Sequence, residues 1–220
     1  RDLEGAMLAS RDAYGDAHRS MSPFLGNHDI PRFSTEAAGN GQGAWGDTPD
    51  LLADGADFVT QWDLVNRQSM AFAFTMTQPG LPLIYYGDEI GLAGDGDPDN
   101  RRFMVWEGRS GNQEELLART RTLGQARARS VALRRGWLRP LWADDDVLAY
   151  ARDAGGGEVA FVALNKGWGD RTVTFAATGV EGVEGRTFVD ALHADRAVTV
   201  TGGTLTVTLG SWESAVFLGE

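Results

Sequence analysis

Residues 81–86 form a continuous apolar run without the polar–apolar alternation of a half-buried strand. Such a run is typical of a parallel strand that is covered on both faces. It follows residues 57–78, an expected helix with apolar side chains on more than one face, and Pro79 and Gly80 end that helix. A buried helix followed by a buried strand indicates an α/β architecture for this part of the chain.

A second apolar run, residues 21–25, leads directly into the polar residues Asn27, His28 and Asp29. An abrupt change from apolar to polar side chains is how a buried strand ends at a reactive rim. Arg32 follows three residues after Asp29, within reach of a carboxylate or a polar ligand. An ordinary strand exit with a hydrogen-bonded histidine would read the same way if this segment stood alone.

Two further helices complete the pattern of alternating helices and strands in the first part of the chain. Residues 2–14 have apolar side chains at helical spacing. Residues 113–135 do as well, with Asn112 and Glu115 resembling a capping box and Gly136 at the end. Repeating strand–helix units with loops after the strands predict an α/β barrel or a doubly wound sheet. Because the sequence opens within a helical pattern, we expect it to be a piece of something longer.

After Gly136 the sequence changes to short β-like segments separated by turn residues. Gly202 and Gly203 occupy the turn between two of them, which is a good hairpin signal, and residues 153–157 form another hairpin loop. We therefore expect an antiparallel β-sandwich over residues 137–220. Its predicted strands are residues 147–152, 159–164, 172–175, 198–201, 205–209 and 215–218.

The composition and net charge of the chain limit the kinds of molecule that it is expected to bind. The 220-residue chain carries a net charge of −11, which argues against nucleic acid and against an anionic membrane. Apolar residues make up 42% of the chain, which indicates a globular protein. No apolar run approaches the roughly 20 residues of a membrane-spanning helix. There is no cysteine, so disulfides and thiol chemistry are excluded.

Three motifs together resemble the α-amylase family of glycoside hydrolases: residues 24–33, residues 80–91 and residues 94–106. They occur in the order and at the separation found in that family, and the expected sandwich follows them. The resemblance implies an α/β plus all-β fold, in which residues 1–136 are the C-terminal portion of a (β/α)8 barrel and residues 137–220 are the sandwich domain. Active sites of such barrels lie at the C-terminal ends of the strands.

The resemblance also implies roles for particular residues. Asp29 corresponds to the third essential carboxylate of the family, which accepts hydrogen bonds from the sugar at the cleavage point and stabilises the transition state. The implied substrate-binding residues are Asn27, His28, Arg32, Asp97 and Arg101, and no residue is implied to bind a metal. Asp97 and Arg101 would bind the next sugar toward the non-reducing end, although this segment is also simply a good turn.

Other positions near these motifs have open interpretations. Tyr86, Asp88 and Glu89 match a family signature, and we interpret them as mainly structural. Phe103 stands where family members of this kind often have proline, so this loop departs from the family pattern at that position. Trp45, on a long polar loop over residues 34–56, is equally suited to stacking on a sugar and to covering the core.

The implied function is that of a retaining hydrolase of α-1,4-glucosidic bonds, with an α-glucan or maltooligosaccharide as substrate. The motifs for the nucleophile and the general acid are not found in this sequence. We therefore expect the chain to need the N-terminal part of the barrel as a partner and to be inactive alone. A glucanotransferase, a cyclodextrin-acting relative and a non-catalytic sugar-binding scaffold stay open as alternatives. No cofactor is expected in this chain, and family members often hold calcium in a preceding domain. A secreted or periplasmic location suits such an enzyme.

Overall fold

The computed structural model describes residues 2–38 and 58–219, and it divides into two compact units. The first unit comprises Arg1–Pro23, Met76–Leu81 and Thr122–Glu220, and the second comprises Phe24–Thr75 and Pro82–Arg121. The division passes through two helices, α3 (Phe58–Thr77) and α4 (Gly111–Arg129). It does not follow the predicted domain boundary at residue 136, which stays a prediction. None of the helices in the described parts is long and apolar enough to cross a membrane.

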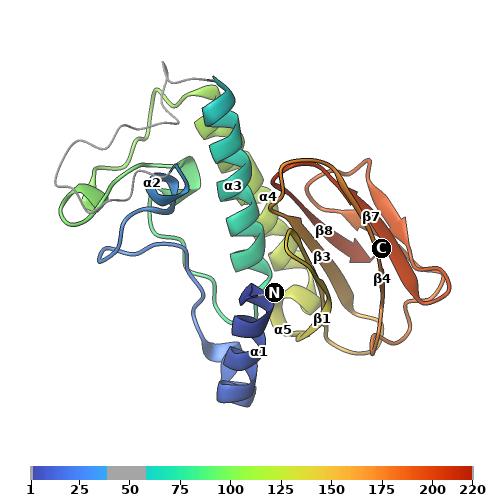
Figure 1. Ribbon diagram of the computed structural model, residues 1–220. Coiled ribbons are helices and arrows are strands. Elements are labelled where there is room, and N and C mark those ends of the chain that lie inside the picture. Colours follow the sequence, from blue (N-terminus) through green and yellow to red (C-terminus); the bar gives the residue numbers. More distant parts are fainter. Residues whose placement is uncertain (1, 39–57, 220) are drawn as a thin grey trace. The chain divides into compact units, whose positions relative to one another are not determined.

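The first unit contains an antiparallel β-sandwich, as predicted, whose two layers can be followed in Figure 1. One sheet has six strands in the order β1-β2-β3-β8-β5-β6, and the other pairs β4 with β7. The strands are β1 (Trp137–Ala143), β2 (Val147–Asp153), β3 (Val159–Asn165), β4 (Arg171–Ala176), β5 (Thr187–Asp190), β6 (Ala197–Thr199), β7 (Thr204–Leu209) and β8 (Glu213–Gly219). The sequence had not singled out β1 and β5 as separate strands.

The sandwich core lies between the two sheets and is built from alternate residues of their strands. Strands β4 and β7 alternate buried and exposed residues, because only one face of their sheet is covered. Strands β2 and β3 are buried along their whole length, since both faces of the larger sheet are covered there. Phe161 and Phe188 meet edge to face in this core, with 4.9 Å between ring centroids.

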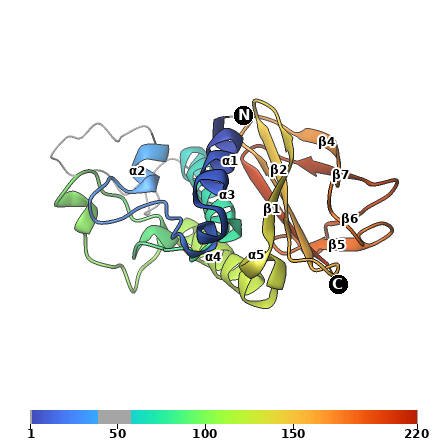
Figure 2. The same ribbon diagram turned by 90° about the horizontal axis from the view of Figure 1, so that it is seen from below.

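The predicted hairpin at Gly202 and Gly203 is only partly right. The turn exists, and Thr201 and Thr204 form an antiparallel bridge across it. However, β6 pairs with β5 in the larger sheet, as Figure 2 shows, whereas β7 pairs with β4 in the smaller one. The chain therefore changes sheets at this turn. Local turn chemistry could not reveal this, because the partner strands lie far away in the sequence.

Side chains from α4 and β2 bind the C-terminal end of α3 within the first unit. Helix α1 (Asp2–Tyr14) was predicted, and a 3-10 helix, η1 (Gly15–Ser20), follows where a polar loop was expected. The guanidinium of Arg127 donates to the carbonyls of Met76 (2.8 Å), Gln78 (3.1 Å) and Gly80 (2.5 Å). Buried Arg152 donates to the carbonyl of Thr77. Two cationic side chains thus satisfy two of the carbonyl groups that an α-helix leaves unpaired at its C-terminus, those of Met76 and Thr77, and also bind the turn that follows.

The helix predicted over residues 113–135 is two helices. Helix α4 ends at Arg129, and α5 (Val131–Arg135) begins after Ser130, whose hydroxyl accepts a hydrogen bond from the amide of Leu133. The capping box lies two residues earlier than predicted. Ser110 Oγ accepts from the amide of Gln113 at 3.2 Å, and Gln113 Oε1 accepts from the amide of Ser110 at 3.0 Å. Serine at an N-cap competes for backbone amides, so it starts new helices rather than continuing old ones.

The second unit contains few regular elements: α2 (Phe33–Ala37) and two 3-10 helices, η2 (Asp88–Ile90) and η3 (Asp99–Arg101), besides its parts of α3 and α4. The predicted parallel strands meet only at one bridge, between Phe24 and Leu83. The bridge is parallel, as predicted, but no ladder extends from it. Pro23 and Pro82 directly precede the two bridged residues and have no N–H to donate, which limits pairing on that side.

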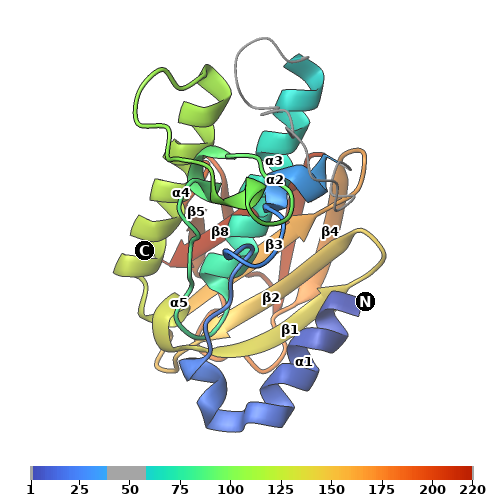
Figure 3. The same cartoon turned by 90° about the vertical axis from the view of Figure 1, so that its left-hand side faces the viewer.

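Helix α2 lies against the loop that follows η2, as Figure 3 shows. Ser34 Oγ donates to the carbonyl of Leu92 at 2.9 Å, and Thr35 Oγ1 accepts from the amide of Gly94 at 2.9 Å. A helix had not been predicted here, within the expected loop of residues 34–56. Trp45 lies outside the described residues.

Candidate functional site

The predicted site begins where the bridged Phe24 leads into residues 26–30. Asn27 Oδ1 accepts a hydrogen bond from the amide of Asp29 at 2.7 Å, which makes an Asx turn. This turn leaves the side chains of His28 and Asp29 directed into solvent, 65% and 67% exposed, with His28 Nε2 3.4 Å from Asp29 Oδ1. The two groups are therefore adjacent, fixed at their backbone and accessible to a ligand.

A second loop, residues 94–101, holds this turn in place. The side chain of Asn100 is fully buried, and its Nδ2 donates to the carbonyls of His28 at 3.0 Å and Ile30 at 2.9 Å. Arg101 Nε also donates to the His28 carbonyl, at 3.2 Å. The backbone of the His28 turn is thus set by side chains that lie about seventy residues later in the sequence.

Asp97 and Arg101, the other predicted substrate-binding pair, lie on this same loop. Asp97 Oδ2 is 3.2 Å from Arg101 Nη2, and both side chains are about half exposed, at 55% and 44%. Since Arg101 also contacts the His28 carbonyl, the structure brings both predicted sugar-binding segments to one place. The expectation that His28, Asp29 and Asp97 lie near the same end of the two bridged segments is confirmed.

Arg32 requires a correction, because its side chain is fully buried and cannot contact a sugar. Its Nη1 donates to Asp88 Oδ1 at 2.9 Å and to the Tyr86 carbonyl at 2.7 Å, and its Nε donates to the Asn100 carbonyl at 3.0 Å. The guanidinium also lies 4.5 Å from the ring centroid of Tyr85. Arg32 is therefore a positioning residue that joins three loops, and not a substrate-binding one.

Asp88 is the buried acid of this arrangement. Its side chain contacts Arg32, and Gln68 Nε2 donates to its backbone carbonyl at 2.7 Å. Burial raises the pKa of Asp88 to about 6, although the charge and hydrogen bond of Arg32 lower it; the charge of Glu89 raises it further. This confirms the structural interpretation of Asp88. A buried ion pair of this kind adds little net stability, because removing both charges from water is costly. Its main effect here is to hold the loops of Arg32 and Asp88 in a fixed arrangement.

The raised pKa of Asp88 predicts a pH-dependent stability. Its ordinary value is 3.8, so between 3.8 and about 6 the folded protein binds more protons than the unfolded chain. The stabilising contribution is therefore fully present below 3.8 and is lost as the pH rises through about 6, in total on the order of 3 kcal/mol. We expect Asp88→Asn to remove this slope from the unfolding free energy measured by denaturant titration across that window.

The control for this experiment is Asp97→Asn, which alters an exposed carboxylate in the same unit. It should keep the slope of the wild type. An Asp88→Asn variant whose stability follows the wild type in parallel across the window would show that Asp88 does not titrate there.

Sequence reasoning missed the residues that hold the site together: Asn100, Gln68, and two glycines. A Cβ on Gly26 would lie 2.8 Å from Asp88 Oδ2, and one on Gly94 would lie 2.5 Å from the Asp99 carbonyl oxygen. Glycine is required where chain segments approach this closely. Both glycines lie within the predicted motifs, Gly26 in residues 24–33 and Gly94 at the start of residues 94–106, and that position was the signal available in the sequence.

The described residues contain no group of three or more histidine, aspartate or glutamate side chains arranged to hold a metal ion. The prediction about calcium concerns a domain that precedes this region in family members. That prediction stays untested.

Comparison with known proteins shows which proteins this chain resembles. The chain is similar to the β/α-amylase of Paenibacillus polymyxa, with 29% identity over 208 residues, 94% of this chain and 15% of the relative. It is 40% identical over 141 residues to the cyclomaltodextrinase of Geobacillus thermopakistaniensis, covering 63% of this chain and 22% of the relative. The cyclomaltodextrin glucanotransferase of Bacillus licheniformis is 30% identical over 164 residues, 74% of this chain and 19% of the relative. No family model matches the chain.

Among solved structures, the α-amylase of Geobacillus thermoleovorans in complex with acarbose has a TM-score of 0.77. The likeness covers 99% of this chain and 42% of that enzyme at 22% identity, so it shows the fold alone. The fold prediction is confirmed: a C-terminal barrel portion and an antiparallel sandwich.

The relatives are glycoside hydrolases and glucanotransferases, so their family is one of enzymes. The chain belongs to the α-amylase family, and it matches the C-terminal part of much longer relatives. It spans between 15% and 22% of the length of the three curated relatives named above.

Proposed function

We propose that the chain is the C-terminal part of a retaining glycoside hydrolase that cleaves α-1,4-glucosidic bonds. The observation that carries this proposal is the pair of exposed side chains, His28 and Asp29, on a backbone turn held by buried Asn100. A buried scaffold that presents two exposed polar groups is built to hold a ligand rather than only to stabilise the fold.

In the proposed mechanism Asp29 accepts hydrogen bonds from the hydroxyls of the sugar at the cleavage point. These bonds become shorter and stronger as the ring flattens toward an oxocarbenium-like transition state, because the developing positive charge polarises the hydroxyls. His28 contacts the same sugar. Asp97 and Arg101 contact the next sugar toward the non-reducing end, and their mutual ion pair keeps both oriented.

The nucleophile and the general acid are proposed to lie in an N-terminal part of the barrel. A retaining enzyme needs these two carboxyl groups about 5–5.5 Å apart, one to attack the anomeric carbon and one to protonate the leaving oxygen. Asp29 can do neither while it holds the sugar hydroxyls. The chain is accordingly proposed to be inactive alone.

A second function is favoured by the relatives themselves, which include a cyclomaltodextrinase and a cyclomaltodextrin glucanotransferase. Either activity would use the same Asp29, because hydrolysis and transfer differ in the acceptor that attacks the glycosyl intermediate. A non-catalytic scaffold is disfavoured, since a scaffold does not require an exposed Asn27-His28-Asp29 turn.

The test is an assay of the full-length protein and of the 220-residue chain on maltoheptaose and on β-cyclodextrin. We expect the full-length protein to release shorter maltooligosaccharides, and the 220-residue chain to release none. Accumulation of products longer than the substrate would favour transfer over hydrolysis. Starch cleavage by the 220-residue chain that disappears with Asp29→Asn would refute the proposed division of the catalytic groups.

A further inference from the structure

Two tryptophans meet on adjacent turns of the sandwich, both in the first unit. Trp168 lies in the turn between β3 and β4, and Trp212 in the turn between β7 and β8. Their ring centroids are 5.9 Å apart with the planes at 86°, an edge-to-face contact. Trp168 is 76% exposed, so a large indole surface faces water. An indole held in this way presents an aromatic face on which a ligand can stack.

Both turns are tied to one buried side chain, that of Asn165 at the end of β3. Its Nδ2 donates to the carbonyls of Gly169 at 2.9 Å and Gly210 at 2.7 Å, while its Oδ1 accepts from the amide of Gly167 at 2.9 Å. Asn165 itself is 0% exposed. The exposed indole therefore stands on a fixed turn, and binding a ligand there would require little ordering of the chain.

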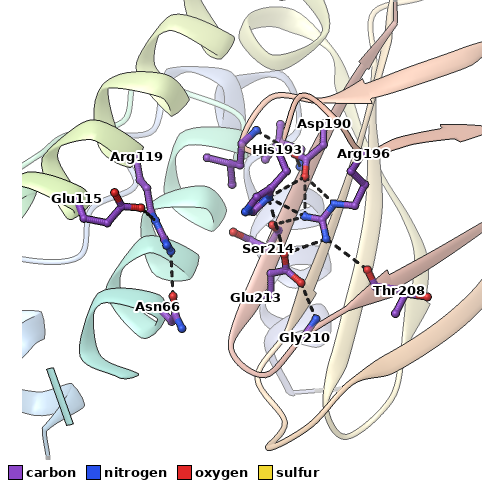
Figure 4. Close-up of polar contacts among 12 residues, drawn as sticks. Asn66, Glu115, Arg119, Asp190, His193, Arg196, Thr208, Gly210, Glu213 and Ser214 are labelled. Atoms are coloured by element: carbon purple, nitrogen blue, oxygen red, sulfur yellow. Dashed lines mark hydrogen bonds and ion pairs between the residues drawn. The ribbon is translucent and has the colours of Figure 1, made fainter. Parts of the chain in front are cut away.

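Trp212 adopts a left-handed backbone conformation, with φ at 52°, the only described residue other than glycine with a positive φ. This conformation is unfavourable for a bulky side chain and persists only where the surroundings enforce it. The next residue supplies that enforcement: Glu213 Oε2 accepts from the amide of Gly210 at 2.5 Å, and its Oε1 pairs with Arg196 Nη1 at 2.9 Å. Figure 4 shows this network, in which Arg196 also contacts buried Asp190 at 2.6 Å.

The chemistry of the surface selects a sugar as its ligand. One face of a pyranose ring presents C–H groups, which pack on the negative face of an indole, while the hydroxyls at the rim remain free for polar side chains. Lys166 and Asp170 flank Trp168 in the same turn, and both are exposed. A nucleobase would stack equally well on the ring, but the net charge of −11 disfavours a polyanion.

We propose that Trp168, supported by Trp212, is a surface binding site for a glucose unit of a polymeric α-glucan. The sugar's identity rests on the proposed function, whereas the stacking site rests on the aromatic geometry alone. A site on the sandwich would hold a long glucan in addition to the residues around Asp29, so it matters for polymers and not for short substrates.

The test compares retardation of the full-length protein in native gels with and without amylopectin. We expect Trp168→Ala to weaken the apparent affinity by about tenfold, as loss of a central aromatic contact does. Its turnover of maltoheptaose in solution should be unchanged. Trp168→Tyr should keep much of the retardation, because a smaller aromatic face remains.

Two control variants separate this inference from the proposed function. Trp142→Ala alters another tryptophan of the sandwich, 37% exposed, whose indole Nε1 donates to Asp144 at 3.2 Å, and it should retard as the wild type does. Asp29→Asn should lose turnover and keep its retardation in the gel. If the wild-type full-length protein shows no turnover but its retardation depends on Trp168, the result would contradict the proposed function and support this site.

Two results would overturn the inference. One is a wild-type protein that amylopectin does not retard, and the other is a Trp168→Ala variant that is retarded like the wild type. In the second case, a loss of several degrees of melting temperature would show that the ring is covered by protein and not by sugar.

Discussion

Asparagine in place of Asp29 should lower kcat of the full-length protein on maltoheptaose by about a hundredfold or more, as loss of a transition-state contact does. Asparagine fills the same volume and keeps one acceptor oxygen, but it removes the negative charge. The charge-assisted hydrogen bonds to the sugar hydroxyls strengthen mainly in the transition state, so kcat should fall more than the affinity for substrate. Steady-state kinetics would give both quantities.

The fold should not respond to this substitution, because Asp29 is exposed and its side chain pairs, among the described residues, only with His28. A matched control is Asp12→Asn on helix α1. The Asp12 side chain is 65% exposed, close to the 67% of Asp29, and is likewise paired with one neighbour, Arg11. This variant should turn over substrate like the wild type. A kcat for Asp29→Asn within about tenfold of wild type, roughly 1.4 kcal/mol of barrier, would remove Asp29 from the mechanism.

The substitution Gly94→Ala should strongly destabilise the second unit, and the nearby Gly96 offers a matched control. Its Cβ would lie 2.5 Å from the Asp99 carbonyl oxygen and 2.7 Å from the Asn100 Cα, distances that backbone atoms do not tolerate. The loop would have to open, which should lower the free energy of unfolding by about 1–3 kcal/mol. Opening would also withdraw Asn100 Nδ2 from the carbonyls of His28 and Ile30.

The expected readouts for Gly94→Ala are a lower denaturation midpoint and a lower kcat/KM, since the turn that carries Asp29 loses its anchor. Gly96→Ala is the control, two residues away in the same loop, where an added Cβ meets nothing within 4 Å. We expect it to match the wild type in both measurements. Equal behaviour of the two variants would show that the close packing of this loop on itself does not support the site.

In the sandwich, the local sequence pattern predicted the positions of strands but not their pairing. Period-two alternation in residues 172–175 and 205–209 matches β4 and β7, because one face of their sheet is buried and the other is solvated. The same pattern could not assign those strands to the smaller sheet. Pairing is decided by long-range contacts, which brought β7 to β4 and left β6 with β5.

In the candidate site, local sequence likewise identified polar residues but did not predict which of them are buried. Asn27, His28 and Asp29 were found from the sequence because an apolar run ends in a cluster of polar groups, and the structure leaves His28 and Asp29 exposed. Arg32 was misassigned for an instructive reason. An arginine three residues from a carboxylate is within reach of a ligand, yet the chain folds so that its guanidinium points inward, onto Asp88 and the Tyr86 carbonyl.

The sequence by itself indicated a cluster of candidate polar residues, where the apolar segments lie and where the β-rich part begins, since these depend on composition and on spacing over a few residues. Only the tertiary structure decided which polar side chains reach solvent and which serve the scaffold. Asp29 and Arg32 are three residues apart, but one is 67% exposed at its side chain and the other is fully buried. Burial depends on the loops of residues 85–101 that fold over Arg32, and those contacts join residues more than fifty positions apart.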